Sequence, residues 1–221
     1  MRIPRTMINP EHTAKDDLYY NQEKPALVPL IPEGPHVVLD LGCGAGKLGR
    51  ALYAKRKAVE VIGVEIYPAA AQEAAKFYKR VHQGDLENLE LDYQGYFDYI
   101  ICGDILEHLK DPYDQVRKIY RWLKKGGRVV ASLPNVRNWR VIVDLVIYGK
   151  WEYADSGILD HTHLRFFTRK TGLKLFEDAN MTVEYHQMLI RGPKKEMANR
   201  LTLGALKEFL GRQVIIVARK D

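Results

Sequence analysis

The chain has 221 residues, 46% of them hydrophobic, and a formal net charge of +6 at pH 7. That length is enough to bury one substantial core, and no apolar run approaches the length of a membrane span. The first residues lead into polar sequence without the apolar core of a signal peptide, so we expect a cytoplasmic protein. The two cysteines, Cys43 and Cys102, are not at metal-ligand spacing and are expected to be reduced thiols.

A glycine-rich turn follows the first apolar run and is the most informative pattern in the chain. Residues 37–41 are typical of a buried parallel strand, and Gly42, Gly44 and Gly46 come directly after them. A helical pattern then begins at residue 47. Glycines let the backbone approach a ligand closely, and the first amides of a helix can hold a polar or anionic group. The sequence therefore predicts a nucleotide-binding turn.

Three kinds of nucleotide site compete for this turn. A phosphate-binding P-loop is excluded, because Leu41 stands where its first glycine belongs and Leu48 cannot supply the metal-binding hydroxyl. A dinucleotide site remains open, since a GxGxxG pattern begins at Gly44 and Glu65 follows that glycine by 21 residues. A site for S-adenosylmethionine is the third possibility, because Asp40 precedes a GxGxG pattern.

The strands expected downstream favour the third possibility. Residues 60–65 predict a second strand that ends in Glu65, whose carboxylate suits a ribose diol in either adenosine cofactor. Residues 81–86 predict a third, with Asp85 placed to bind an adenine amino group, for which a dinucleotide enzyme gives no particular reason. A fourth strand is expected at 97–104 and a fifth at 128–133. Alternating strands and helices indicate one α/β domain with a doubly wound sheet.

At this point the chain resembles the class I S-adenosylmethionine-dependent methyltransferases. The segments that carry the resemblance are LDLGCGAGKLG at 39–49, VIGVE at 61–65, QGDLE at 83–87, FDYIICGDILEHL at 97–109 and WLKKGGRVVASLPN at 122–135. A DxxHxRxFT box at 160–168 is similar to that of a bacterial and archaeal branch. The resemblance covers residues 18–221 and implies a seven-stranded, mostly parallel Rossmann-like sheet with an antiparallel last strand. In that branch the acceptors are often saccharides or other small hydroxylated molecules.

The resemblance also implies which residues contact the cofactor. Around the methionine portion they are Asp40, Gly42 and Gly44, with Gly46 in the same turn. Around the adenosine they are Glu65 for the ribose hydroxyls, Ile66 for one adenine face, and Asp85 with Leu86 for the adenine edge. The backbone of Cys102 and Gly103 is expected to meet the methionine amino end. Structural alternatives stay open, since Gly46 can simply permit helix packing and Asp85 can cap a loop.

The acceptor side is expected in two segments outside the sheet. Residues 1–34 resemble the family's N-terminal segment and lid, in which Tyr19 and Tyr20 are candidate substrate contacts. Residues 35–221 form the methyltransferase domain, with an acceptor-site insertion at 134–168 that is too long for an ordinary loop. We expect a covering helix at 138–148 and an aromatic surface at Trp151. Further on, the sequence predicts a helix at 195–210 between strands at 181–190 and 213–220.

Positive charge is concentrated between residues 115 and 175, which hold 13 Lys and Arg against 4 Asp and Glu. This excess suits an anionic acceptor, and Arg137 and Arg165 are its expected contacts. The alternative is a solvated helix face, which we favour for the basic residues at 117–125. Nucleic acid is an unlikely partner, because the chain has no RNA-binding motif.

A histidine is expected to remove the acceptor proton. His163 occupies the histidine position of the box, and an imidazole with a near-neutral pKa suits general base catalysis. Asp160 is expected to orient its ring, and His108, after the fourth strand, is the rival base. A metal site at Asp160, His161 and His163 is disfavoured, because alternating residues of an extended segment point to opposite sides. We therefore assign no metal.

The sequence thus predicts an S-adenosylmethionine-dependent methyltransferase that methylates a hydroxyl of a small or saccharide-like acceptor. Three alternatives stay open: a nicotinamide-dependent oxidoreductase, an RNA methyltransferase and a non-catalytic protein that binds the same cofactor. The acceptor's identity and the oligomeric state are not specified by these patterns.

Overall fold

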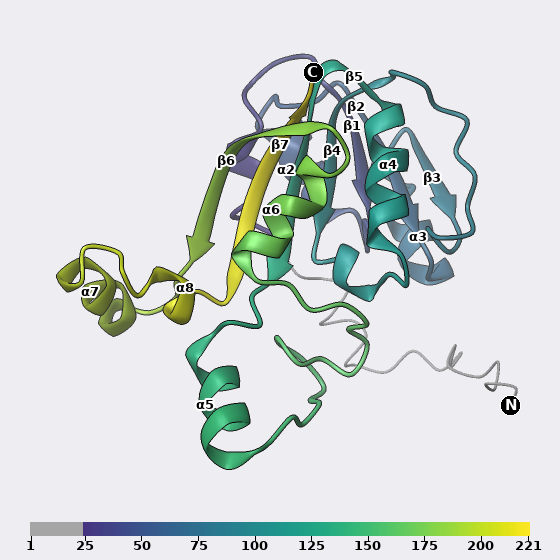
Figure 1. The fold of residues 1–221 in the computed structure, drawn as a ribbon. Coiled ribbons are helices and arrows are strands. Elements are labelled where there is room, and N and C mark those ends of the chain that lie inside the picture. Colours follow the sequence, from purple (N-terminus) through teal and green to yellow (C-terminus); the bar gives the residue numbers. More distant parts are fainter. Residues whose placement is uncertain (1–23) are drawn as a thin grey trace, which may run out of the picture.

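The computed structural model describes residues 24–221, which form a seven-stranded sheet with helices on both faces (Figure 1). The strand order is β3-β2-β1-β4-β5-β7-β6. The strands are β1 (Val37–Leu41), β2 (Glu60–Glu65), β3 (Arg80–Gln83), β4 (Phe97–Gly103), β5 (Leu123–Pro134), β6 (Met181–Leu189) and β7 (Gln213–Lys220). Strands β1 to β5 pair in parallel, and β7 runs antiparallel between β5 and β6. The predicted fold class is confirmed.

The helical elements connect these strands. They are η1 (Val28–Leu30), α2 (Lys47–Ala54), α3 (Pro68–Ala74), η2 (Leu106–His108), α4 (Pro112–Trp122), α5 (Trp139–Tyr148), α6 (Arg169–Glu177), α7 (Pro193–Leu201) and α8 (Lys207–Leu210). Figure 1 shows α4 and α6 in front of the sheet, while α5 and α7 extend away from it. None of the helices in the described part of the chain has the length and apolar character needed to cross a membrane.

Alternation along the buried strands produces a separate core on each face of the sheet. In β1, Leu39 and Leu41 pack in one core with side chains of α4 and α6. Val38, the residue before Leu39, packs in the other core with α2 and the segment around η1. A period of two is what the pleat of a strand dictates, and burial on both faces explains why these strands read as continuous apolar runs.

Parallel pairing brings the ends of β1, β2 and β4 to one edge of the sheet. Asp40 of β1 lies opposite Gly63 of β2 on one side and Ile101 of β4 on the other. The chain builds β1, β2 and β3 outward in one direction and then returns to place β4 on the other side of β1. Such a reversal opens a crevice beyond the carboxyl ends of the strands, where open α/β sheets bind ligands.

Tyr78 links the first strand to the helix after the glycine turn. Its hydroxyl donates to Asp40 Oδ2 over 2.7 Å and accepts from the Gly49 backbone N–H at 2.9 Å. A Cβ on Gly49 would lie only 2.2 Å from a carbon of the Tyr78 ring, so a glycine is required there for packing. Burial raises the pKa of Asp40 to about 6, against the smaller lowering effect of the Tyr78 hydrogen bond.

The helix expected at 138–148 is confirmed as α5, and the one expected at 195–210 is not continuous. Asn138 caps α5 by accepting from the Arg140 N–H, and Thr168 caps α6. The helix expected at 195–210 is wrong as one unit, because α7 ends at Leu201 and α8 begins at Lys207. Leu203 and Gly204 between them both have positive φ, which a right-handed helix does not allow. Tyr19 and Tyr20 lie outside the described residues.

Replacing Tyr78 by Phe should destabilise the fold by about 1–3 kcal/mol, because Asp40 loses a donor and the Gly49 N–H loses an acceptor inside the core. Urea unfolding measures the change. Tyr148→Phe on the exposed face of α5 is the control and should stay within about 0.5 kcal/mol of the original chain. Equal stability of the two variants would contradict the structural role of this hydroxyl.

A second prediction concerns pH. Because the folded-state pKa of Asp40 is raised to about 6, protonated Asp40 is favoured in the folded chain. The stability that this protonation contributes is lost as the pH rises from 4 through 6. The stability difference between the original chain and Asp40→Asn should fall by about 3 kcal/mol over this range, at about 1.36 kcal/mol for each pKa unit. Urea unfolding at pH 4 to 7 tests it, and parallel curves for the two chains would refute it.

Candidate functional site

The glycine turn after β1 has the backbone shape that the sequence predicts. Gly42, Gly44 and Gly46 all have positive φ. At Gly42, with φ of 68°, a side chain would be strained and its Cβ would lie 2.9 Å from Ile105 Cδ1. The turn therefore stays open toward the crevice only with glycine at this position. Asp40, one residue before the end of β1, is buried and held by Tyr78 instead of facing solvent.

Glu65 holds the glycine turn from the end of the neighbouring strand. Its Oε2 accepts from the Gly44 N–H at 2.8 Å, and its Oε1 accepts from the Tyr67 N–H at 3.0 Å. Burial raises the pKa of this carboxyl, while the backbone donors act in the opposite direction. Ile66, the next residue, is 43% exposed. A carboxylate and an apolar surface thus lie side by side at the end of β2.

Asp85 follows β3 and accepts hydrogen bonds from within its own loop. Its donors are the Glu87 N–H and the Asn88 side-chain amide. The loop-capping alternative therefore describes this residue as it stands in the structure. Leu86 beside it is buried in the core.

Lys24 lies over the end of β4. Its Nζ donates to the Gly103 carbonyl and is 3.5 Å from Asp104 Oδ2. The Gly103 carbonyl was expected to meet the amino end of methionine, and here it accepts from an ammonium group of the same chemical type. Cys102, one residue earlier, is fully buried, and burial raises the pKa of its thiol. The contact of Lys24 with the Gly103 carbonyl favours the fit of an amino-acid ammonium at the same carbonyl.

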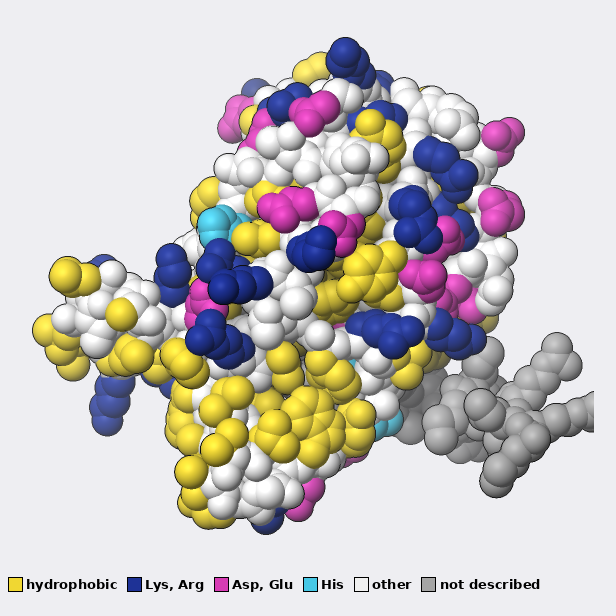
Figure 2. Space-filling model, viewed as in Figure 1, with side chains coloured by type: hydrophobic (Ala, Val, Ile, Leu, Met, Phe, Trp, Pro, Cys, Tyr) yellow, Lys and Arg dark blue, Asp and Glu magenta, His cyan; other side chains and the backbone are white. Residues whose placement is uncertain are grey.

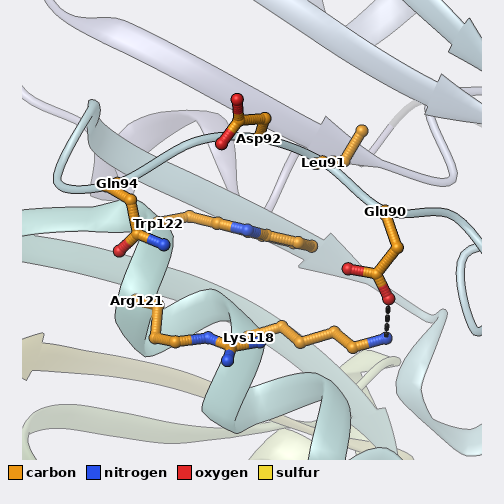
Figure 3. Close-up of a pocket in the computed structure, with 7 residues that line it drawn as sticks. All are labelled: Glu90, Leu91, Asp92, Gln94, Lys118, Arg121 and Trp122. Atoms are coloured by element: carbon orange, nitrogen blue, oxygen red, sulfur yellow. Dashed lines mark ion pairs between the residues drawn. The ribbon is translucent and has the colours of Figure 1, made fainter.

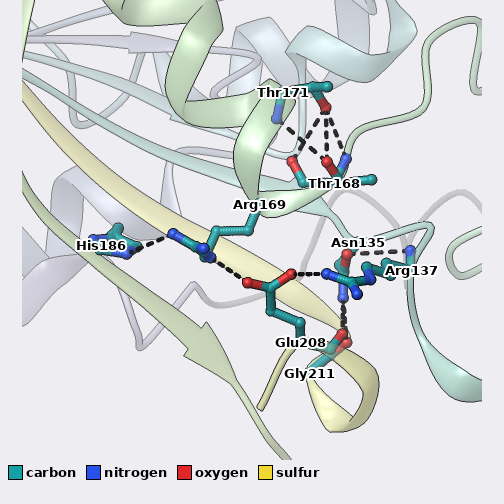
Figure 4. Close-up of polar contacts among 8 residues, drawn as sticks. All are labelled: Asn135, Arg137, Thr168, Arg169, Thr171, His186, Glu208 and Gly211. Atoms are coloured by element: carbon teal, nitrogen blue, oxygen red, sulfur yellow. Dashed lines mark hydrogen bonds and ion pairs between the residues drawn. The ribbon is translucent and has the colours of Figure 1, made fainter. Parts of the chain in front are cut away.

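The arginines expected at an anionic acceptor have protein partners. Arg137, in the insertion, pairs with Glu208 of α8, and Arg169 donates to the other oxygen of Glu208 over 2.7 Å (Figure 4). Arg165 donates through Nε to the Lys110 carbonyl over 2.9 Å. Their guanidinium groups stabilise the insertion, and the local positive charge is in part compensated inside the protein.

The insertion exposes apolar side chains. Val146 and Ile147 of α5 are each 69% exposed, and only Val141 of this helix is buried (Figure 2). Trp151, in the loop that follows, stands edge to face with Phe166 at 5.2 Å between ring centroids. Hydrophobic side chains accordingly gather over this part of the molecule.

Glu107, His108 and His163 meet beyond the end of β4. Glu107 is 0% exposed, and neither carboxylate oxygen has a hydrogen-bond partner among the residues that the structure describes. His163 Nε2 lies 3.9 Å from Glu107 Oε1, and the rings of His108 and His163 are 4.7 Å apart between centroids. One ligand atom of each residue lies within 4.8 Å of the others. We call these three residues the Glu–His–His cluster.

Burial shifts the pKa values in this cluster in opposite directions. Desolvation raises the pKa of Glu107 well above its ordinary value, with the Asp104 charge acting in the same direction. Desolvation lowers the pKa of His108 to about 4, and the neighbouring His163 lowers it further. His108 is therefore neutral at pH 7.

The prediction that Asp160 orients His163 is wrong. His163 Nδ1 lies 3.0 Å from the Ile158 carbonyl, which orients the ring instead. Asp160 Oδ1 accepts from the N–H and the hydroxyl of Thr162. His161 is exposed, and its Nδ1 lies 3.3 Å from the Ala154 carbonyl, outside the cluster.

Glu107 was missed by the sequence analysis, and His108 and His163 were treated as rivals. The signal available was the pair Glu107-His108 directly after a strand that ends at the crevice. Which distant residue meets this pair depends on how the insertion folds back. Backbone contacts bring the insertion to this pair, because the N–H groups of Leu164 and Arg165 both donate to the Glu107 carbonyl at 2.9 Å.

A surface pocket of about 290 Å³ lies elsewhere (Figure 3). Its lining comes from the loop before β4 and from the last turns of α4, and Lys118 pairs there with Glu90 at 3.9 Å. Both segments lead into the amino ends of strands, at the edge of the sheet opposite the glycine turn. This pocket is therefore separate from the site.

Comparison with known proteins agrees with this geometry. A family model described as a methyltransferase domain matches residues 14–186. The ubiquinone biosynthesis O-methyltransferase of Pseudomonas paraeruginosa is 32% identical over 153 residues, 66% of this chain and 65% of that protein. Its counterpart in Coxiella burnetii is 30% identical over 173 residues, 71% of this chain and 70% of that protein. The counterparts in Pseudomonas aeruginosa and Azotobacter vinelandii are covered over 49% and 44% of their length, so the chain spans about half to two thirds of the length of these relatives.

Solved structures show the same fold. An S-adenosylmethionine-dependent methyltransferase from Mesorhizobium loti is similar with a TM-score of 0.63 at 20% identity, covering 88% of this chain and 96% of that one. One from Archaeoglobus fulgidus gives a TM-score of 0.63 at 20% identity, covering 93% and 94%. By the match of the family model to most of its length, the chain belongs to the S-adenosylmethionine-dependent methyltransferases.

Proposed function

We propose that the chain methylates a hydroxyl oxygen of a small acceptor that enters between the crevice and the insertion at 134–168. The observation that carries the proposal is the Glu–His–His cluster, which joins the loop after β4 to the DxxHxRxFT box. The cluster lies beside the edge of the sheet where the cofactor is expected, and the Glu107 carboxylate has no hydrogen-bond partner in the described part of the chain. The names of the relatives, ubiquinone biosynthesis O-methyltransferase, support oxygen as the methylated atom.

The residues at the crevice fit the cofactor. S-adenosylmethionine, when bound, supplies a methyl group already activated on a sulfonium. We assign the ribose hydroxyls to Glu65, the adenine to Ile66, Asp85 and Leu86, and the methionine portion to Asp40, the glycine turn and the backbone of Cys102 and Gly103. The Gly103 carbonyl, to which Lys24 already donates, has a second lone pair with which it can accept from the amino group.

The protein's own contributions to catalysis are the positioning of the two reactants and the removal of the acceptor proton. Holding two reactants in contact can lower a barrier by about 7–11 kcal/mol, whereas a general base contributes about 10²- to 10⁴-fold in rate. We assign the base to His163, with His108 as the alternative. The His163 imidazole would take up the hydroxyl proton as the acceptor oxygen receives the methyl group that the bound cofactor would supply.

Two features describe the acceptor. The arginine content near the insertion favours a saccharide-like or anionic molecule, with Tyr19, Tyr20, Arg137, Trp151 and Arg165 as candidate contacts. The exposed apolar side chains of α5 and the names of the relatives favour an acceptor with an apolar ring. Incubation with methyl-labelled cofactor and separate pools of nucleotide sugars and phenolic compounds, followed by mass spectrometry, distinguishes the two classes.

Glu65→Ala should weaken S-adenosylmethionine binding about 10- to 100-fold, because a hydrogen bond to a charged group contributes about 1.5–3 kcal/mol. Calorimetric titration measures the affinity, and titration with a nicotinamide dinucleotide in the same assay should give no heat. Glu60→Ala, at the opposite end of β2, is the matched control and should keep the original affinity. Equal losses in the two variants would overturn the assignment.

His163→Gln should lower kcat about 10²- to 10⁴-fold, since it removes the base, while the affinity for S-adenosylmethionine stays within about threefold. Turnover with labelled cofactor and calorimetry provide the two readouts. His161→Gln, in the same box but outside the cluster, should retain activity. Unchanged turnover in His163→Gln together with loss in His108→Ala would assign the base to His108 instead.

A further inference from the structure

The residues around the Glu107 carboxylate do not replace the hydrogen bonds with water that it loses on burial. Both oxygens are buried and lack hydrogen-bond partners in the described part of the chain, and the nearest basic nitrogen is His163 Nε2 at 3.9 Å. A buried carboxylate without hydrogen bonds is strongly destabilising unless a cation or proton compensates it. The element that carries it, η2, places His108 directly beside it.

The second ring nitrogen of His163 indicates its tautomer. A carbonyl oxygen can only accept, so the contact of His163 Nδ1 with the Ile158 carbonyl at 3.0 Å places the proton on Nδ1. Nε2 then presents a lone pair, and it faces an oxygen of Glu107 that is also an acceptor when ionised. Two acceptors that face each other require a proton or a metal cation between them, and at 3.9 Å these two atoms are too far apart to share a proton in a hydrogen bond.

The same reasoning applies to His108. Its Nδ1 lies 3.0 Å from Thr162 Oγ1 and 3.3 Å from the Thr162 carbonyl. The Thr162 hydroxyl already donates to Asp160 Oδ1 over 2.7 Å, so it accepts from His108 Nδ1–H. Nε2 is then the nitrogen that can bind a metal. The Asp160 carboxylate, the Thr162 hydroxyl and the His108 ring thus form a chain of hydrogen bonds. This chain orients the His108 ring, as hydrogen-bond partners of metal-binding histidines commonly do.

The ligand set indicates the class of metal. Two imidazoles and one carboxylate suit Zn²⁺ and related transition ions, whereas Mg²⁺ and Ca²⁺ prefer oxygen ligands throughout. Three protein ligands are typical of sites that keep a position open for water or substrate. The ligand atoms, now within 4.8 Å of one another, need to move closer by side-chain rotation to reach metal bonds of about 2.0–2.2 Å.

We propose that Glu107, His108 and His163 bind one divalent transition-metal ion of the Zn²⁺ type, and that its open position receives the acceptor hydroxyl. The second half of this statement rests on the proposed function. The ion would lower the pKa of the bound hydroxyl, whose proton leaves to solvent water. In this arrangement the two histidines hold the ion and orient the acceptor, and proton loss to water replaces the general base role assigned to His163 above.

The test is a Co²⁺ titration of the full chain after chelator treatment, followed by visible absorption and by Zn²⁺ competition. We expect one site per chain with the absorption of a low-symmetry Co²⁺ centre. Glu107→Gln, His108→Ala and His163→Gln should each weaken binding at least tenfold. His161→Ala, the matched control in the same box, should bind as the original chain does. Circular dichroism establishes that each variant is folded, and should Glu107→Gln not fold, the two histidine variants decide.

Absence of a stoichiometric site would overturn the proposal, and so would equal affinity in His163→Gln and His161→Ala. Methyl transfer to a hydroxyl acceptor that persists after metal removal would also overturn it, while leaving the proposed O-methylation intact. Stoichiometric binding that the cluster variants abolish supports the metal site even if no hydroxyl acceptor is methylated, an outcome that would instead count against the proposed function.

Discussion

The parallel pairing of β1 with both β2 and β4 is the constraint on which the site depends. Because the three strands run in the same direction, their carboxyl ends share one edge, and the glycine turn, Glu65 and the end of β4 meet there. No local property of these segments brings them together, since they are far apart in sequence. The two cores on the faces of the sheet fix this arrangement, and the polar groups at its edge follow from it.

The parts of the site that could be predicted from sequence are those whose position depends on strand direction alone. The turn at Gly42 and the carboxylate of Glu65 belong to this class, because the direction of a parallel strand determines at which edge of the sheet the residues at its carboxyl end lie. The Glu–His–His cluster does not, since it depends on how a long insertion folds back over η2. Alternation along an extended segment argued against a metal at the box, and the structure does not keep that segment extended. A helix was expected across Leu203, where the positive φ of Leu203 and Gly204 interrupts it, although Gly204 gave a weak signal.

The two buried glutamates of the site differ in their hydrogen bonding. Glu65 is buried but accepts two backbone hydrogen bonds, so its charge is solvated by the protein and holds the turn. Glu107 is buried without such donors. Most buried polar groups in folded proteins are satisfied, so an unsatisfied carboxylate beside two imidazoles indicates a function more than a contribution to stability.

The contacts around Glu208 have a consequence for how acceptor preference can change. Its carboxylate joins Arg137 to Arg169, and the Val136 N–H donates to the Phe167 carbonyl at 2.9 Å, so the insertion is closed at its base. A loop whose ends are already fixed can be lengthened or exchanged at a small entropic cost. The segment between these contacts can therefore change in length and sequence while the seven strands stay as they are. Under the proposed function, acceptor preference can change in this way without altering the strand ends at which the cofactor is expected.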